Sequence, residues 1–180
     1  MLRGGVWFSP IPVAVAAAVF ALALVAVTLI RPERRRAWAR WMLGASLAGV
    51  LAVTMLGGSG GSGIPNLTPG DTIVPQLTNP DYPLGRFNVI GNLAVFVPIG
   101  WLVALLAAPR LTAGSRVLVG AAAGTLLSIA IEITQGLTGR VADIDDVILN
   151  GVGALAGAVV AVALSALRRG ARGDAAVVGE

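Results

Sequence analysis

Long apolar stretches dominate the chain, and short polar or Gly/Pro-rich segments separate them. Five stretches reach about 20 residues, which is the length that a helix needs to cross the hydrocarbon core of a bilayer. They occupy residues 11–30, 37–56, 88–108, 115–137 and 147–167. The pattern predicts an all-α fold, a polytopic transmembrane helical bundle of about five spans.

The basic residues divide unequally between the two sides of such a bundle. All 13 are arginines, and ten of them fall on one side. The ten are Arg31, Arg34, Arg35, Arg36, Arg40, Arg110, Arg116, Arg168, Arg169 and Arg172. The other side keeps Arg3, Arg86 and Arg140. Because arginine-rich loops stay in the cytoplasm, we expect the N-terminus outside and the C-terminus in the cytoplasm.

This topology divides the chain into four segments. We expect two N-terminal transmembrane helices in 1–56, an extracytoplasmic Gly/Pro-rich loop in 57–87, a three-helix core in 88–167 and a disordered cytoplasmic tail in 168–180. The loop begins with GGSGGSG, a composition typical of flexible linkers. Five prolines follow. We therefore expect a mobile flap or re-entrant cover there, without a folded domain.

The residue types that are missing exclude several chemistries. The chain has no cysteine, no histidine and no lysine. Disulfides, thiolate nucleophiles, histidine bases and Schiff-base lysines are therefore excluded, together with the usual zinc and haem ligands. No aromatic-basic surface suggests a nucleic-acid partner. The expected partner is the lipid bilayer.

Residues 128–150 concentrate polar side chains in a very apolar chain. They contain Glu132, Gln135, Arg140, Asp143, Asp145, Asp146 and Asn150. Polar groups are costly at membrane depth, and they usually face a bundle interior, a cavity or one another. The cluster is therefore either a site or a polar clasp that holds the bundle together.

Helical spacing gathers these groups on one face of each core span. The members are, span by span, Asn88 and Asn92; Thr125, Ser128, Glu132 and Gln135; and Asp146, Asn150, Gly153 and Gly157. We expect the polar faces to point inward, with Arg86 and Arg140 at the outer rim. The Gly153–Gly157 spacing favours a close packing contact between helices.

Three chemistries suit the cluster. Asp143, Asp145 and Asp146 offer the oxygen ligands that Mg²⁺ or Ca²⁺ prefers, but Asp-x-Asp-Asp is short and common. We do not favour a divalent cation, and the sequence identifies no cofactor.

The second chemistry is anion recognition, since Arg86 and Arg140 can each hold a phosphate bidentately. The third is acid–base catalysis by Glu132. Against all three stands a structural interpretation, in which the aspartates cap the last helix and interhelical polar pairs hold the bundle together.

Two segments carry motifs at compatible spacing. Residues 86–106 contain N-x-x-x-F-x-P-x-G, formed by Asn92, Phe96, Pro98 and Gly100. Residues 128–157 contain E-x-x-Q, R, D-x-x-D, N and G-x-x-x-G, formed by Glu132, Gln135, Arg140, Asp143, Asp146, Asn150, Gly153 and Gly157. Together they resemble the VanZ-like family of membrane proteins, named for a teicoplanin-resistance accessory protein. The resemblance implies a polytopic protein in the plasma membrane of a bacterium. By association, it also implies a role of the protein in glycopeptide antibiotic resistance of the cell envelope.

Our preferred hypothesis combines the residues with the resemblance. The protein would bind or modify an extracytoplasmic lipid headgroup or lipid-linked cell-wall precursor. Glu132 would be the catalytic residue if a reaction occurs. The expected ligand-binding residues are Arg86, Asn88, Asn92, Gln135, Arg140, Asp143, Asp146 and Asn150. The alternatives are a scaffold that recruits partners through the small-xxx-small faces and, less favoured, a small transporter.

Overall fold

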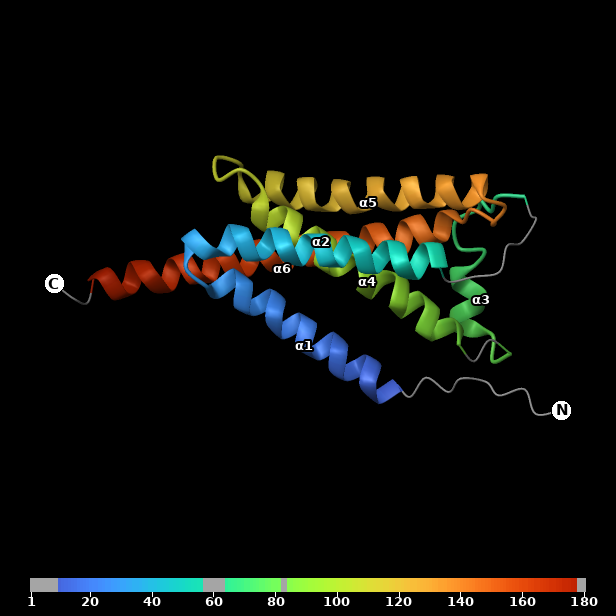
Figure 1. The fold of residues 1–180 in the computed structure, drawn as a ribbon, viewed down its shortest axis with the longest axis horizontal. Coiled ribbons are helices and arrows are strands. Elements are labelled where there is room, and N and C mark those ends of the chain that lie inside the picture. Colours follow the sequence, from blue (N-terminus) through green and yellow to red (C-terminus); the bar gives the residue numbers. More distant parts are fainter. Residues whose placement is uncertain (1–9, 57–63, 82–83, 178–180) are drawn as a thin grey trace.

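The chain folds into a bundle of helices along one long axis (Figure 1). A computed structural model describes residues 10–56, 64–81 and 84–177. Within them lie six helices: α1 (Pro10–Leu29), α2 (Pro32–Leu56), α3 (Ile73–Thr78), α4 (Gly85–Leu106), α5 (Ala113–Leu137) and α6 (Ile144–Val177). The described residues form no named strand. The prediction of an all-α fold is therefore confirmed.

Three of the described helices are long and apolar enough to cross a membrane. They are α4, α5 and the Ile144–Ala171 part of α6. α1 adds a shorter apolar stretch, Phe20–Leu29. α2 begins in the arginine-rich segment, so its first turns are strongly charged. The chain is a membrane protein, and the five-span topology stays a prediction.

α6 differs from expectation at its C-terminal end. The helix continues to Val177, although a disordered tail was expected from residue 168. The expectation is corrected for 168–177, and 178–180 lie outside the described residues. Alanines and arginines favour helix and no proline interrupts this stretch, so the helix can continue past the apolar span.

α4 and α6 make the closest helix contact of the bundle core. A Cβ added at Gly100 would lie 1.8 Å from the carbonyl oxygen of Ala154, and one added at Gly157 would lie 2.0 Å from that of Val97. A Cβ at Gly153 would meet a backbone carbonyl in the same way. Only glycine allows the two backbones to approach so closely. The predicted packing role of the G-x-x-x-G spacing is confirmed.

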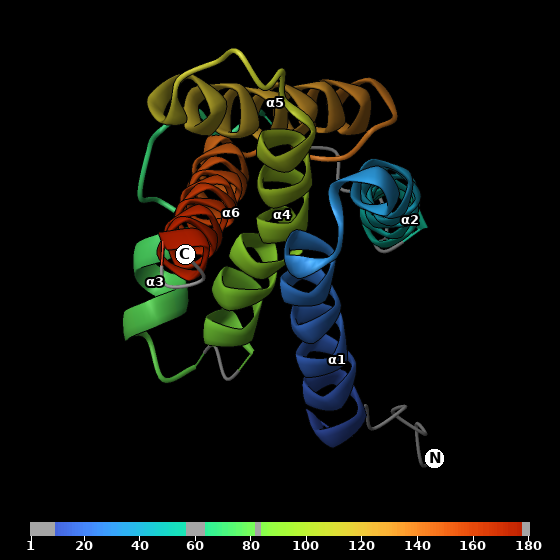
Figure 2. The same cartoon turned by 90° about the vertical axis from the view of Figure 1, so that its left-hand side faces the viewer.

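α1 and α2 lie to one side of the α4–α5–α6 core (Figure 2). Thr28, near the end of α1, is buried. Its Oγ1 accepts a hydrogen bond from Trp101 Nε1 of α4 at 2.9 Å, and its carbonyl oxygen accepts one from Arg168 Nη1 of α6 at 2.9 Å. Val50 of α2 packs in a cluster with Phe96 of α4. These contacts attach the N-terminal pair to the core.

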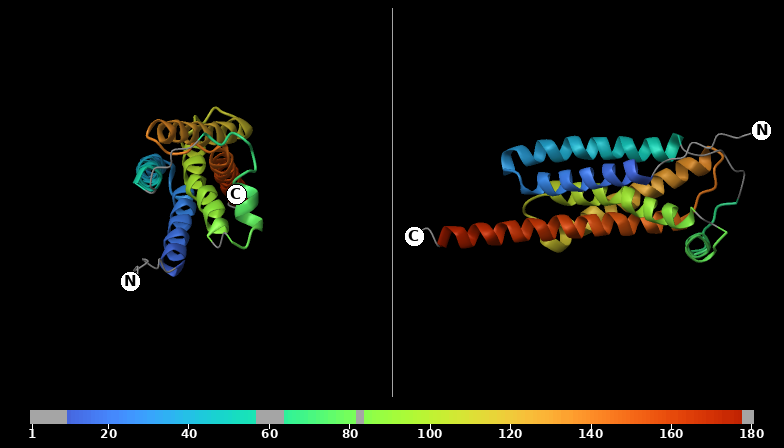
Figure 3. Two further views of the ribbon diagram at one scale, coloured as in Figure 1. Left: turned by 90° about the vertical axis from the view of Figure 1, so that its right-hand side faces the viewer. Right: turned by 90° about the horizontal axis from the view of Figure 1, so that it is seen from below.

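The two ends of the bundle differ in the elements that form them. Figure 3 shows α3 at one end, while the C-terminal part of α6 extends beyond the other. The turn between α5 and α6 lies at the α3 end, and the turns after α1 and α4 lie at the opposite end (Figure 1). The polar cluster and most arginines are therefore held far apart.

Candidate functional site

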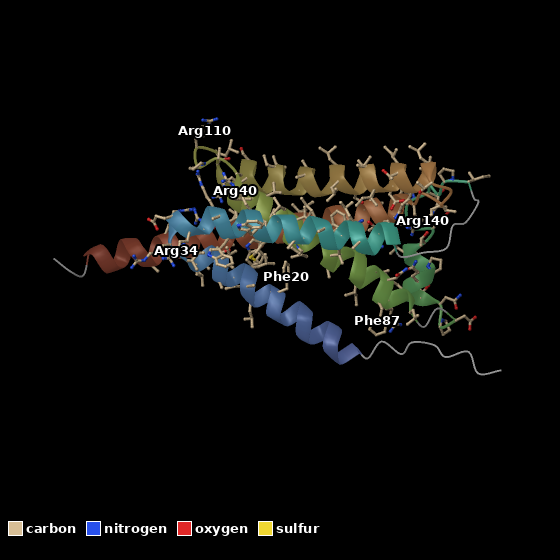
Figure 4. The ribbon with its side chains drawn as sticks, viewed as in Figure 1. Phe20, Arg34, Arg40, Phe87, Arg110 and Arg140 are labelled. Carbon is tan, nitrogen blue, oxygen red and sulfur yellow. The ribbon has the colours of Figure 1, made fainter. Side chains whose placement is uncertain are left out.

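The polar stretch of the sequence lies at the α3 end of the bundle. Figure 4 places Arg140 at this end and Arg34, Arg40 and Arg110 at the opposite one. We call the α3 end the polar end and the opposite one the arginine end. The separation that the sequence predicted between acidic and arginine-rich segments is thus present along the bundle axis.

A tight turn between α5 and α6 positions the site residues. Gly139 has a φ of 85°, in the left-handed region that glycine adopts without strain. The Arg140 amide then donates to the Gln135 carbonyl at 2.9 Å, which closes the end of α5. Asp143 follows as the N-cap of α6, because its Oδ1 accepts from the Asp145 amide at 2.9 Å. The predicted capping role is confirmed for Asp143.

Glu132 lies inside the last turns of α5 and is 7% exposed. Its Oε2 accepts a hydrogen bond from the Asp143 amide at 2.7 Å. Asp143, Asp146 and Arg140 lie close enough to interact with it electrostatically. Glu132 is therefore the centre of the charged cluster, with one carboxylate oxygen oriented by the start of α6.

Asp145 is fully buried and binds the segment that leads into α3. Its Oδ1 accepts from the Gly70 amide at 2.7 Å, and its Oδ2 accepts from the amides of Thr72 and Ile73 at 2.8 and 3.0 Å. Gly70 has a φ of 94°, which suits glycine at this close approach. Hydrogen bonds to an ionised carboxylate are stronger than neutral ones. Asp145 therefore fixes the loop.

Asp143 also binds the segment before α3, through the side chains of that segment. Its Oδ1 accepts from Asn66 Nδ2 at 3.1 Å, and its Oδ2 accepts from Thr72 Oγ1 at 2.5 Å. The backbone adds a bridge in which the Asn66 amide donates to Ala142 and its carbonyl accepts from Ile144, both at 2.9 Å. The expectation of a mobile flap is corrected for 64–73, and the glycine-rich start of the loop, 57–63, lies outside the described residues.

Amide side chains connect the three core helices. Asn92 of α4 donates to Asp146 Oδ1 of α6 at 2.5 Å, and Asn150 of α6 donates to Ser128 Oγ of α5 at 2.9 Å. These residues share the inward faces that the sequence predicted. Asn88 does not, because it is exposed one turn before Asn92. The stripe on α4 turns outward near the start of the helix.

Gln135 and Arg140 are connected to the end of α2. The Nε2 of Gln135 donates to the Thr54 carbonyl at 3.0 Å, and Arg140 Nη1 donates to the same oxygen. This carbonyl belongs to the last turn of α2, where a helix has no internal donor for it. The two side chains thus cap α2.

The two arginines that could each hold a phosphate have different surroundings. Arg86 is exposed, and its Nε donates to the Leu77 carbonyl of α3 at 3.4 Å. Arg86 therefore contacts α3, whereas Arg140 contacts the end of α2.

The acidic trio is not arranged as a ligand set. Among the described residues, no group of three or more His, Cys, Asp or Glu side chains could hold a metal ion. The reason lies in their partners: Asp145 binds loop amides, Asp143 binds Asn66 and Thr72, and Asp146 binds an amide of α4. The three carboxylates point to different elements.

Sequence reasoning identified most of the cluster but missed Asn66, Gly70 and Thr72. Their segment, NLTPGDT, is rich in turn and capping residues, which was the only local signal. Asp143 and Asp145 bind the loop before α3. The other two acidic residues of the cluster, Glu132 and Asp146, accept hydrogen bonds from Asp143 and Asn92 instead. Both can accept hydrogen bonds from a ligand or exchange a proton with it.

Comparison with known proteins supports the motif-based interpretation. Neither the curated proteins nor the solved structures contain a match to this chain. A family model described as VanZ/LLP1 matches residues 17–165, so the match extends from α1 through the whole polar end into the second half of α6. The chain therefore belongs to the VanZ/LLP1 family.

Proposed function

We propose that this VanZ/LLP1 protein binds or modifies a lipid or lipid-linked cell-wall molecule at the extracytoplasmic face of a bacterial plasma membrane. By this action it would contribute to tolerance of glycopeptides such as teicoplanin. One observation supports the proposal most. A buried, charged cluster around Glu132 lies at the end of an apolar bundle, at the opposite end from the arginine-rich turns.

The charge of the cluster suggests which part of the ligand it meets. Its acidic members are Glu132, Asp143, Asp145 and Asp146, and Arg140 is its basic member. Such a negative site favours groups that donate hydrogen bonds, such as hydroxyls and amines, over a bare phosphate. The proposal therefore places ligand hydroxyl or amine groups near Glu132 and Asp146. Arg140 remains the candidate for an anionic group.

If the ligand is modified, Glu132 is the proposed acid or base. Its carboxylate is buried and held on one side by the Asp143 amide, so its orientation is fixed before a ligand arrives. The chain has no Ser–His or Cys–His pair, because it has neither histidine nor cysteine. Proton transfer is therefore favoured over a covalent acyl mechanism.

Complementation of a deletion strain under teicoplanin tests the proposal. Glu132→Gln and Asp146→Asn remove a charge but keep an oxygen that can accept from Asp143 and Asn92, respectively. We expect both variants to lose rescue at membrane levels matched to wild type. Asp71→Asn is the control, since Asp71 is an exposed carboxylate on the loop at the same end.

Equal rescue by all variants would contradict a role of Glu132 and Asp146 in this phenotype. If the wild-type protein does not restore growth under teicoplanin, teicoplanin tolerance is no longer part of the proposal. The scaffold alternative is not favoured, because Gly153 and Gly157 are buried against α4 and are not open to a partner. Nor is transport, since the charged groups gather near the two ends of the bundle.

A further inference from the structure

Exposed apolar side chains gather where α3 meets the start of α4. Val74 and Leu77 of α3 are 56% and 41% exposed, and Leu84 and Phe87 at the start of α4 are 72% and 67% exposed. Ile90, one turn further along α4, is 63% exposed. We call these five residues the apolar rim. The function proposed for the polar end uses none of them.

α3 packs directly against the start of α4. A Cβ added at Gly85 would lie 2.5 Å from the Gln76 carbonyl oxygen, so the two backbones approach closely there. Arg86 Nε also donates to the Leu77 carbonyl at 3.4 Å. Val74 and Leu77 are one turn apart on α3 and share a face, which is exposed. The apolar rim is therefore formed by two helices in contact.

α3 lies across the end of the bundle. In the right-hand view of Figure 3, α3 is seen end-on while α2 and α6 run lengthwise. Asp145 of α6 fixes the start of α3, because it accepts from the amides of Thr72 and Ile73. Since α4, α5 and α6 are long and apolar enough to cross a membrane, the bundle axis runs through the membrane. α3 therefore lies along the membrane plane, as interfacial helices do.

The apolar rim continues the exposed face of a membrane-crossing helix. Phe87, Ile90 and Ala94 follow one another along α4 at helical spacing, and all three are exposed. Apolar side chains that are exposed on such a helix face the acyl chains of the bilayer. An exposed apolar patch marks contact with a membrane or with another protein. The continuity with α4 favours the membrane.

Charged residues limit how deep the apolar rim can lie. Asp71 precedes α3 and Asp81 follows it, and both are exposed. A carboxylate is costly in the hydrocarbon core of a bilayer, so both should stay in water or among the headgroups. The apolar rim should therefore lie at the boundary between headgroups and acyl chains.

We propose that the apolar rim contacts lipid, with Val74, Leu77 and Phe87 inserted about 5–10 Å into the bilayer leaflet at the polar end. The partner is the boundary region between the headgroups and the acyl chains. The proposal goes beyond the function proposed above and does not rest on it. It would hold the charged cluster at the depth of the lipid headgroups, because Asp145 connects α3 to the start of α6.

Fluorescence of single probes on the full-length protein tests this proposal. The chain has no cysteine, so one introduced thiol can carry a nitrobenzoxadiazole dye, whose emission shifts to the blue in an apolar environment. The test variants are Leu77→Cys and Phe87→Cys. Asp71→Cys and Asp81→Cys are the controls, since they are exposed residues that flank the same helix. Each labelled protein is placed in phosphatidylcholine nanodiscs, in which water reaches both faces.

Two quenchers then report the surroundings of each dye: iodide in the water, and a nitroxide near the headgroup end of the acyl chain. We expect blue-shifted emission at 77 and 87, with stronger quenching by the nitroxide than by iodide, and the reverse order at 71 and 81. Equal quenching by iodide at all four positions would overturn the proposal. A blue shift without nitroxide quenching would also overturn it, because protein would then cover the apolar rim. The melting temperature of each labelled variant checks that it remains folded.

Discussion

Neighbouring acidic residues at the start of α6 differ in what they contact. Asp145 is fully buried and accepts three backbone hydrogen bonds from the loop before α3. Asp146 contacts Asn92, and its side chain is only partly buried. Since Asp145 meets its partners inside the chain, its charge stabilises the fold. Glu132 and Asp146 accept fewer hydrogen bonds within the protein than Asp145 does, so they are the better candidates for binding a ligand.

Replacing Asp145 therefore has a predictable structural effect. Asp145→Asn turns one acceptor oxygen into a donor, so at least one loop amide loses its partner. Leaving a buried donor without an acceptor costs about 2 kcal/mol. We expect a lower melting temperature in detergent and faster proteolysis within 64–81. Asp81→Asn, at an exposed carboxylate, should leave both unchanged. An unchanged melting temperature in Asp145→Asn would show that the hydrogen bonds from Asp145 to the loop do not stabilise the fold.

Residue-scale prediction from sequence succeeded where contacts are local. The capping role of Asp143 followed from its place before an apolar helix, and the inward faces of Ser128 and Asn150 followed from helical spacing. The partners of Asp145 could not be predicted. They lie more than seventy positions earlier in the chain, in a loop without periodicity.

Helix packing depends on small residues where α4 crosses α6. Gly100 meets the backbone of Ala154, and Gly153 and Gly157 meet carbonyls of α4. The sequence predicted this surface on α6 from the G-x-x-x-G spacing. It did not identify which helix packs there, because the spacing is the same for an internal contact and for a contact with another protein.

Adding one methyl group at this crossing should be costly. A Cβ at Gly100 would overlap the Ala154 carbonyl, so Gly100→Ala forces α4 and α6 apart. We expect destabilisation of about 3 kcal/mol or a loss of folded protein. Gly91→Ala is the matched control on the same helix, since a Cβ there meets nothing within 4 Å. Equal melting temperatures for the two variants would show that the helices do not pack this closely.

Across the whole molecule, the two ends of the bundle carry opposite chemistry. The polar end holds the acidic cluster around Glu132, and the arginine end holds Arg34, Arg40 and Arg110. The sequence predicted this division from charge distribution alone.

The orientation of the bundle is open to direct labelling. The chain has no cysteine, so a single introduced thiol reports its side of the membrane. We expect Asp81→Cys to react with a membrane-impermeant maleimide in intact cells, because it lies on the exposed loop at the polar end. Ala113→Cys, exposed at the arginine end, should react only after lysis. The reverse pattern would place the polar end in the cytoplasm.

The most direct test of the central claim is native mass spectrometry of the protein extracted from bacterial membranes, comparing wild type with Glu132→Gln. The account predicts that wild type carries a lipid or lipid-linked species with hydroxyl or amine groups, and that the variant loses it while keeping its melting temperature. If both proteins carry the same species in the same amount, Glu132 does not bind it, and the polar end is a structural clasp only.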